Sequence, residues 1–240
     1  MTKNLPNNLT VKIWRGTSNG AFETFSVPSL KSQSILDVVT YIQRHLDATL
    51  TYRFACRVGM CGSCAMTVNG VARWTCRTHV DKVSQNNQLT IEPLRNLEVI
   101  RDLATDMAPF FEKWQKSGAR FEGAQTRADK IAPIDPTCKK RIAASAAIEC
   151  INCAVCFSAC DTVKARNDYV GPAALNRAWS LLNDEKHARQ STLKKAVQAN
   201  GGCYTCHSHA SCSQSCPVSL DPAGSIASLK RSYSVFGDRT

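Results

Sequence analysis

Long apolar runs are missing from this sequence. The longest candidates fall short of about 18 residues, because Arg177, Asn183 or cysteines interrupt them. The sequence therefore predicts no membrane span, and any membrane contact should be peripheral. An apolar signal segment is also missing after Met1. We therefore expect a reducing compartment, in which a disulfide framework is rare.

What the sequence has instead is cysteine, 13 in all. The most specific group is CINCAVCFSAC, which runs from Cys150 to Cys160 with the spacing C-x2-C-x2-C-x3-C. This spacing is typical of chains that wrap a cubane iron-sulfur cluster. Zinc is the alternative, but zinc sites usually pair two C-x2-C units. The run therefore indicates a cluster.

A second run, CYTCHSHASCSQSCP, repeats this outline, with Pro217 after its last cysteine and His209 where a middle cysteine would stand. In two-cluster ferredoxins the fourth cysteine of each run ligates the other run's cluster. This rule predicts a 4Fe-4S site with four thiolates, and a second site with only three, which favours a 3Fe-4S cluster. The predicted ligands are Cys150, Cys153, Cys156 and Cys216 for the 4Fe-4S cluster, and Cys160, Cys206 and Cys212 for the 3Fe-4S cluster.

Three further residues leave alternatives open. Histidine ligates some iron-sulfur clusters, so His209 is a candidate fourth ligand that would retain a fourth iron; the other interpretation is that its ring points away. Cys203 stands two residues before Cys206 in C-x2-C spacing and is a candidate alternative ligand. Otherwise Cys203 and Cys138 are free thiols.

A third group of cysteines lies nearer the N-terminus, in ACRVGMCGSCAMTVNGVARWTC. Its members, Cys56, Cys61, Cys64 and Cys76, have the C-x4-C-x2-C opening of plant-type 2Fe-2S ligation, followed by C-x11-C. Gly59 and Gly62 allow a tight loop whose backbone amides can point at the sulfurs. Zinc is again the alternative, which the glycine-rich loop and the short return to Cys76 disfavour.

The surrounding pattern predicts an α+β protein with two domains. Alternating segments predict a hairpin over 9–27 and another over 65–74 with Asn69-Gly70 at its tip. Apolar residues at helical spacing predict a helix that Ser34 opens. This order fits a β-grasp 2Fe-2S domain, residues 1–106. A last strand from Leu89 should lead past Pro93 into a helix that reaches Trp114.

Residues 107–240 are expected to form an all-helical domain that binds the 4Fe-4S and 3Fe-4S clusters. An irregular connector is expected over 116–136, and helices are expected over 172–183, 191–199 and 221–233. The formal charge is +11. Each oxidised cluster with its thiolates carries about −2, so three clusters reduce this charge to about +5. With no nucleic-acid motif present, we expect no nucleic-acid partner.

Taken together, these features resemble the iron-sulfur subunit of succinate dehydrogenase and fumarate reductase, the respiratory complex II family, essentially from end to end. The residues that carry the resemblance are Arg57 with GMCGSCAM, VIRDLATDM at the expected inter-domain helix, ECINCAVCFSAC, Gly171-Pro172-Ala173-Ala174, Cys206-His207, Cys212, Cys216-Pro217 and Asp221-Pro222.

The resemblance implies an electron-transfer subunit without substrate chemistry of its own. It implies a flavoprotein partner that carries FAD, membrane anchor subunits with a quinone, and electron flow through the 2Fe-2S, 4Fe-4S and 3Fe-4S clusters. His207 and Lys230 match positions that approach the quinone in the family. The implied location is the cytoplasmic face of the inner membrane, or the matrix side in a mitochondrion.

Two departures from the family pattern affect the details. Asp161 stands directly after Cys160, where the family usually has proline. Its carboxylate, when ionised, should lower the reduction potential of the cluster that Cys160 ligates. The segment DTVKARN lacks the tryptophan that is common in ubiquinone-using members, so menaquinone or another acceptor stays open. The alternative functions are a freestanding ferredoxin-like carrier and a subunit of a soluble fumarate reductase.

Overall fold

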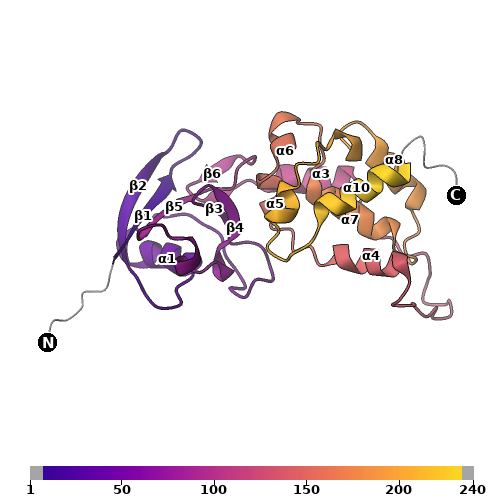
Figure 1. Cartoon of the computed structure of the whole chain (residues 1–240), viewed down its shortest axis with the longest axis horizontal. Coiled ribbons are helices and arrows are strands. Elements are labelled where there is room, and N and C mark those ends of the chain that lie inside the picture. Colours follow the sequence, from indigo (N-terminus) through magenta and orange to yellow (C-terminus); the bar gives the residue numbers. More distant parts are fainter. Residues whose placement is uncertain (1–7, 234–240) are drawn as a thin grey trace. The chain divides into compact units, whose positions relative to one another are not determined.

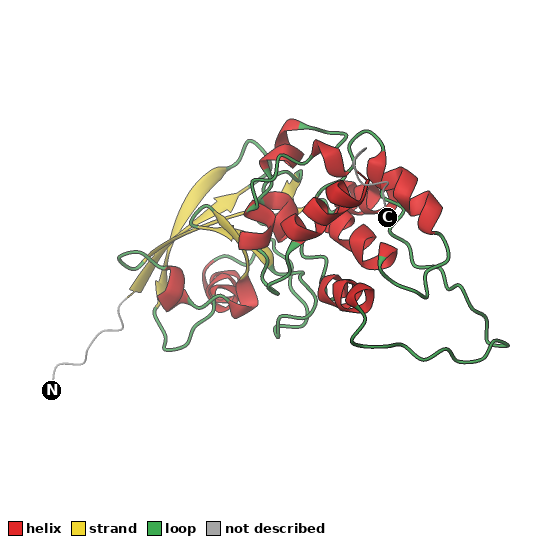
Figure 2. Cartoon of the chain, turned by 45° about the vertical axis from the view of Figure 1, so that its right-hand side comes forward, coloured by secondary structure: helices red, strands yellow, loops and turns green. Residues whose placement is uncertain are grey.

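The computed structural model describes residues 8–233. Within it the chain divides into two compact units. Unit 1 consists of the residues up to Met107 together with Ile151–Ser158, and unit 2 consists of Ala108–Cys150 together with the residues from Ala159 onward. The predicted domain boundary after residue 106 stays a prediction. The strands belong to unit 1, whereas unit 2 is built from helices and loops (Figures 1 and 2).

Unit 1 contains a five-stranded sheet with the order β2-β1-β5-β3-β4. The two central neighbours, β1 and β5, run parallel, and the other pairs are antiparallel. The strands are β1 Asn8–Arg15, β2 Ala21–Pro28, β3 Ala65–Val68, β4 Val71–Trp74 and β5 Gln88–Glu92. Together with the helix described next, this topology confirms the predicted β-grasp fold and both predicted hairpins.

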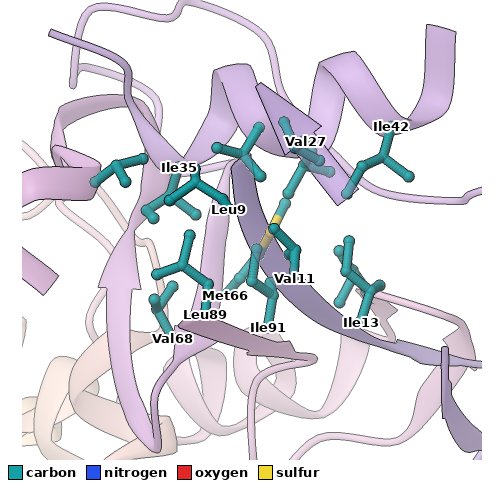
Figure 3. Packing of buried hydrophobic residues seen from close by; sticks show 14 of the residues in the cluster. Leu9, Val11, Ile13, Val27, Ile35, Ile42, Met66, Val68, Leu89 and Ile91 are labelled. Carbon is teal, nitrogen blue, oxygen red and sulfur yellow. The ribbon is translucent and has the colours of Figure 1, made fainter. Parts of the chain in front are cut away.

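The helix α1 (Ile35–Tyr41) continues into a π-helical turn, η1 (Ile42–Leu46), and covers the core of unit 1. It begins where the sequence predicted, because the Ser34 hydroxyl accepts a hydrogen bond from the Asp37 amide, and the Asp37 carboxylate accepts one from the Ser34 amide. Alternation buries one face of β1, and these apolar side chains pack against those of β3, β5 and α1 (Figure 3).

The chain after β5 does not form the helix that we predicted between Pro93 and Trp114. Val99–Arg101 and Ala104–Thr105 form two short antiparallel strands, β6 and β7, and the helix α3 covers only Ala108–Lys116. The helical prediction was therefore wrong over the whole of VIRDLATDM, and only the part of the expected helix from Ala108 onward is helical.

Asp102 explains this departure. It is almost fully buried and has a left-handed backbone with φ of 51°, which ends any helix at this point. Its carboxylate accepts hydrogen bonds from the amides of Gly16 and Thr51, at 2.7 and 2.8 Å, and from the Arg15 guanidinium at 2.9 Å. These tertiary contacts outweigh the helical spacing of the apolar residues.

The other elements of unit 1 are short: η2 Thr75–Arg77, α2 Val80–Val83 and α5 Val155–Ser158. Unit 2 contains α3, α4 Lys139–Ile148, α6 Asp161–Ala165, α7 Pro172–Leu182, α8 Gln190–Gln198, η3 Cys203–Thr205, α9 Ser211–Gln214 and α10 Pro222–Tyr233. The helices predicted after residue 170 are confirmed within one or two residues, whereas α4 had not been predicted. No helix within residues 8–233 is long and apolar enough to cross a membrane.

The helix α7 is the centre of unit 2 and contacts α3, α4, α8 and α10 (Figure 1). It is buried on nearly all sides, and two of its polar side chains are hydrogen-bonded to α4. The Asn176 amide group donates to the carbonyl of Ala147, and the Ser180 hydroxyl donates to that of Ala144, both at 3.0 Å and both on α4. Residues 117–138 form the irregular connector that was expected.

Candidate iron-sulfur centres

The group nearest the N-terminus lies in unit 1, in the loop before β3 and in η2. It consists of Cys56, Cys61, Cys64 and Cys76. Backbone amides point at its sulfurs, as the glycine-rich sequence predicted. The Met60 amide donates to the Cys56 sulfur at 3.3 Å, and the Cys76 amide donates to the Cys64 sulfur at 3.5 Å. The Cys56 amide donates to the Cys61 sulfur at 3.5 Å. These amides would stabilise negative charge on sulfur, which suits thiolate ligands of a cluster.

The pKa values show how close these thiols lie to one another. The Ser63 hydroxyl, followed by the Cys56 amide, lowers the pKa of Cys61 to about 6. Burial, followed by the neighbouring Cys64, raises the pKa of Cys76 to about 12. The negative charge of Cys56 raises it further. Cys76 thus lies close enough to Cys64 and Cys56 for its thiolate to be repelled by theirs, which a positively charged iron centre would neutralise.

The loop around these cysteines depends on left-handed residues. Arg57, Gly59 and Gly62 have φ values of 59°, 78° and 70°. The Arg57 guanidinium lies over the Phe54 ring, 4.7 Å from its centroid, which helps to hold this unfavourable backbone. Gly62 has a second constraint, because a Cβ atom there would lie 2.7 Å from the Cys153 Cβ atom. The loop that carries Cys56, Cys61 and Cys64 is therefore in contact with Ile151 and Cys153 within unit 1.

The predicted 4Fe-4S ligands are divided between the units: Cys153 and Cys156 belong to unit 1, whereas Cys150 and Cys216 belong to unit 2. In unit 1, the Asn96 side chain donates to the Phe157 carbonyl at 2.9 Å and thereby holds α5, the helix that contains Cys156. In unit 2, the Leu220 amide donates to the Cys216 sulfur at 3.3 Å. The ligand set stays a prediction.

The three predicted 3Fe-4S ligands all lie in unit 2 and line one hollow of about 290 Å³, including the space at its mouth. The Ser208 amide donates to the Cys206 sulfur at 3.3 Å. Burial raises the pKa of Cys212 to about 11, and the charges of Cys160 and Cys206 contribute in the same direction. The hollow therefore presents three sulfurs and a backbone amide, which fits a cluster with three thiolate ligands.

The candidate extra ligand lines the same hollow, and the two candidate quinone-site residues contact residues that line it. His209 lines it, with an exposed side chain, and its ring is roughly parallel to that of His207, with 6.2 Å between centroids. Asp161 also lines the hollow, at the start of α6. The Lys230 ammonium donates to the Cys206 carbonyl at 2.6 Å and to the Ser208 hydroxyl at 3.2 Å. Lys230 therefore holds the cysteine loop.

The two cysteines outside the predicted sets differ in exposure. Cys203 is fully buried, is not among the residues that line the hollow, and has a pKa that burial raises. These properties favour the interpretation of Cys203 as a free thiol. Cys138 is exposed at the N-terminus of α4. Among residues 8–233, no group of three or more His, Cys, Asp or Glu side chains is arranged to hold a metal ion.

Comparison with known proteins identifies two iron-sulfur cluster-binding domains in this chain. The family described as "2Fe-2S iron-sulfur cluster binding domain" matches residues 10–112, and the one described as "4Fe-4S dicluster domain" matches residues 146–220. The fumarate reductase iron-sulfur subunit of Mycobacterium tuberculosis is 33% identical over 213 residues, which cover 87% of this chain and 84% of the relative. The chain belongs to the family of succinate dehydrogenase and fumarate reductase iron-sulfur subunits.

Further comparisons agree with membership of this family. The mitochondrial succinate dehydrogenase [ubiquinone] iron-sulfur subunit of Candida glabrata is 30% identical over 201 residues, covering 82% of this chain and 78% of the relative. A chain of the Mycobacterium smegmatis Sdh1 complex shares the fold, with a TM-score of 0.86, 21% identity and coverage of 98% of this chain and 100% of that chain. This chain is thus an iron-sulfur subunit of an oxidoreductase, with a 2Fe-2S domain and a 4Fe-4S dicluster domain.

Sequence reasoning missed two residues of these centres. Ser63 was not singled out, although its hydroxyl is the main cause of the low pKa of Cys61; its place between Cys61 and Cys64 was the available signal. Tyr169 was also missed. It lines the hollow beside the three cysteines, and nothing in the segment NDYVGP indicated that.

Proposed function

We propose that this subunit carries electrons singly between the FAD of a flavoprotein subunit and a membrane quinone, through 2Fe-2S, 4Fe-4S and 3Fe-4S clusters. FAD exchanges an electron pair with its substrate, whereas a quinone is reached in one-electron steps, so a chain of one-electron centres must connect them. Iron-sulfur clusters supply that chemistry. The protein contributes ligands, amide hydrogen bonds and burial, which set each potential.

The observation that carries this proposal is the arrangement of three separate thiol groups in the family order. The proposed 2Fe-2S ligands are Cys56, Cys61, Cys64 and Cys76; the 4Fe-4S ligands are Cys150, Cys153, Cys156 and Cys216; the 3Fe-4S ligands are Cys160, Cys206 and Cys212. The contact between Gly62 and Cys153 supports short electron transfer between the first two sites. The three-thiol hollow supports a 3Fe-4S end.

The proposed partners follow from the same role. We infer that the 2Fe-2S domain faces the flavoprotein and that the helical domain sits on membrane anchor subunits with the quinone. A peripheral position on the inner membrane follows, at its cytoplasmic or matrix face. Purification of the native assembly tests this directly, because a stable complex with a flavoprotein and hydrophobic small subunits is expected. An isolated monomer with all clusters would instead support a freestanding carrier.

The cluster content gives the first quantitative prediction. We expect about nine irons per chain, with three distinct paramagnetic signals from 2Fe, 4Fe and 3Fe centres. Iron and acid-labile sulfide analysis, combined with paramagnetic resonance at several temperatures, measures this. A zinc content that matches the cysteines, or only two cluster signals, would contradict the proposal.

A second prediction concerns the quinone end. Replacing the exposed His207 by alanine should slow quinone reduction roughly tenfold, the effect of one lost hydrogen bond. Electron flow from succinate to an artificial acceptor that accepts at the flavin should stay unchanged. Lys230→Ala should do the same and should also perturb the 3Fe-4S signal, because Lys230 holds the Cys206 carbonyl.

Lys194→Ala is the matched control, because this lysine is exposed on α8 in the same unit. Both assays should be unchanged in that variant. Equal losses in both assays for His207→Ala would mean that this residue holds structure and does not serve the quinone.

A third prediction concerns His209. If the hollow holds a 3Fe-4S cluster, the air-oxidised protein should give a 3Fe-4S signal of about one spin per chain, and His209→Val should leave that signal unchanged. Quantitative paramagnetic resonance of both proteins is the measurement. A signal that is absent in wild type and appears in His209→Val would instead establish the histidine as a fourth ligand and the centre as 4Fe-4S.

A further inference from the structure

Tyr169 is a fully buried tyrosine in unit 2 whose hydroxyl makes no hydrogen bond of good geometry among the described residues, although the Cys206 side chain lies near it. Buried hydroxyl groups in native proteins almost always have a partner, because an unpaired one loses its hydration without compensation. The Tyr169 hydroxyl therefore points to an acceptor beside Cys206, in the site predicted to hold a cluster.

The surroundings of Tyr169 show where that acceptor belongs. The side chain lines the hollow together with Cys160, Cys206 and Cys212. The hydroxyl is therefore a hydrogen-bond donor beside the three predicted cluster ligands.

The backbone fixes this position. The Tyr169 amide donates to the Arg166 carbonyl at 3.2 Å, and the Val170 amide donates to the Gly201 carbonyl at 2.9 Å. Gly201 has φ of 79°, and a Cβ atom there would lie 2.0 Å from the Asp168 carbonyl oxygen. This close packing leaves the tyrosine little freedom to turn away from the hollow.

We propose that the Tyr169 hydroxyl donates a hydrogen bond to a sulfur atom of the cluster held by Cys160, Cys206 and Cys212, and thereby raises the reduction potential of that cluster. This inference rests on the proposed function. Tyr169 acts as a positioning and tuning residue, because it binds no iron.

The direction of the effect follows from charge. One-electron reduction adds a negative charge to the cluster, and a donor aimed at its sulfur stabilises the reduced form more than the oxidised form. Asp161 lines the same hollow and acts in the opposite direction, because a carboxylate destabilises the added charge. The potential of this centre would then reflect a balance between the two side chains.

Redox titration of the isolated complex, followed by the 3Fe-4S paramagnetic signal, tests the inference. Tyr169→Phe keeps the ring and removes only the hydroxyl, so the signal should keep its intensity. The equilibrium constant for reduction should fall about tenfold, which is a midpoint potential about 59 mV lower. Tyr204→Phe is the control, since that hydroxyl is exposed and directed at the Lys230 carbonyl, and it should leave the potential unchanged.

A second measurement begins with the wild-type protein. Double resonance on the wild-type signal should detect a coupled proton that exchanges in deuterated water and that is missing in Tyr169→Phe. If no such proton is present in wild type, or if the potential of Tyr169→Phe equals that of wild type, the inference is wrong while the cluster assignment stands. If wild type shows no 3Fe-4S signal at all, the proposed function fails instead.

Discussion

Replacing Cys61 by alanine is expected to remove the 2Fe-2S centre completely. Cys61 is the thiol with the lowered pKa, because the Ser63 hydroxyl and the Cys56 amide stabilise its thiolate. The predicted site has four thiolates, and no cysteine outside the set occurs between Cys56 and Cys76 to substitute for a lost one. Loss of one ligand from a 2Fe-2S cluster exposes an iron that the remaining three thiolates cannot retain.

Paramagnetic resonance of the reduced protein measures this loss, and far-ultraviolet circular dichroism checks that the sheet is intact. Cys153→Ala should remove the 4Fe-4S signal for the same reason. Cys138→Ala is the matched control, because that exposed thiol belongs to no predicted site, and all three signals should remain. A full 2Fe-2S signal in Cys61→Ala would show that the ligand set is wrong.

The parts of the fold that were predictable are those in which local pattern and burial agree. In β1, alternation places Leu9, Val11 and Ile13 on the buried face, and the same residues form the core. In α1, Ser34 and Asp37 form the expected capping box. Each signal comes from residues a few positions apart, so the sequence alone contains it.

Two predictions of secondary structure failed, one because of contacts with residues far away in the sequence and one because of a weak apolar pattern. The segment around Asp102 has helical spacing, but Arg15, Gly16 and Thr51, which lie far away in the sequence, hold Asp102 in the turn between β6 and β7. The helix α4 was missed because its sequence, KKRIAASAAI, offers small alanines instead of a stripe of large apolar residues, and its only buried residues are Ala144 and Ala147.

In the candidate centres, too, local patterns were predictable from the sequence, whereas contacts between distant residues were not. Cysteine spacing indicated three groups, because cluster ligation is a local pattern in each run. The position of Tyr169 in the hollow could not be predicted, since α6, α9 and the segment before α7 come together only after folding. Gly62 lies between these cases: the sequence indicated a tight loop, but only the fold reveals which atoms approach it.

Replacing Gly62 by alanine should therefore damage two centres at once. The new Cβ atom would lie 2.7 Å from the Cβ and 2.8 Å from the Cα atom of Cys153, and 2.9 Å from the Ile151 carbonyl oxygen. Backbone atoms cannot rotate away from such a clash, so the Cys153 segment or the 2Fe-2S loop must shift. We expect loss of most of the 4Fe-4S signal and a weakened 2Fe-2S signal.

Gly70→Ala separates this contact from backbone strain. Gly70 has φ of 77°, similar to the 70° of Gly62, but a Cβ atom there would meet nothing within 4 Å. Both variants share a left-handed strain of about 1–2 kcal/mol, which a thermal unfolding transition can register. Only Gly62→Ala should lose cluster signals in paramagnetic resonance. If Gly70→Ala loses them equally, strain and not the approach to Cys153 is the cause, and the contact between the two loops has no role in holding the clusters.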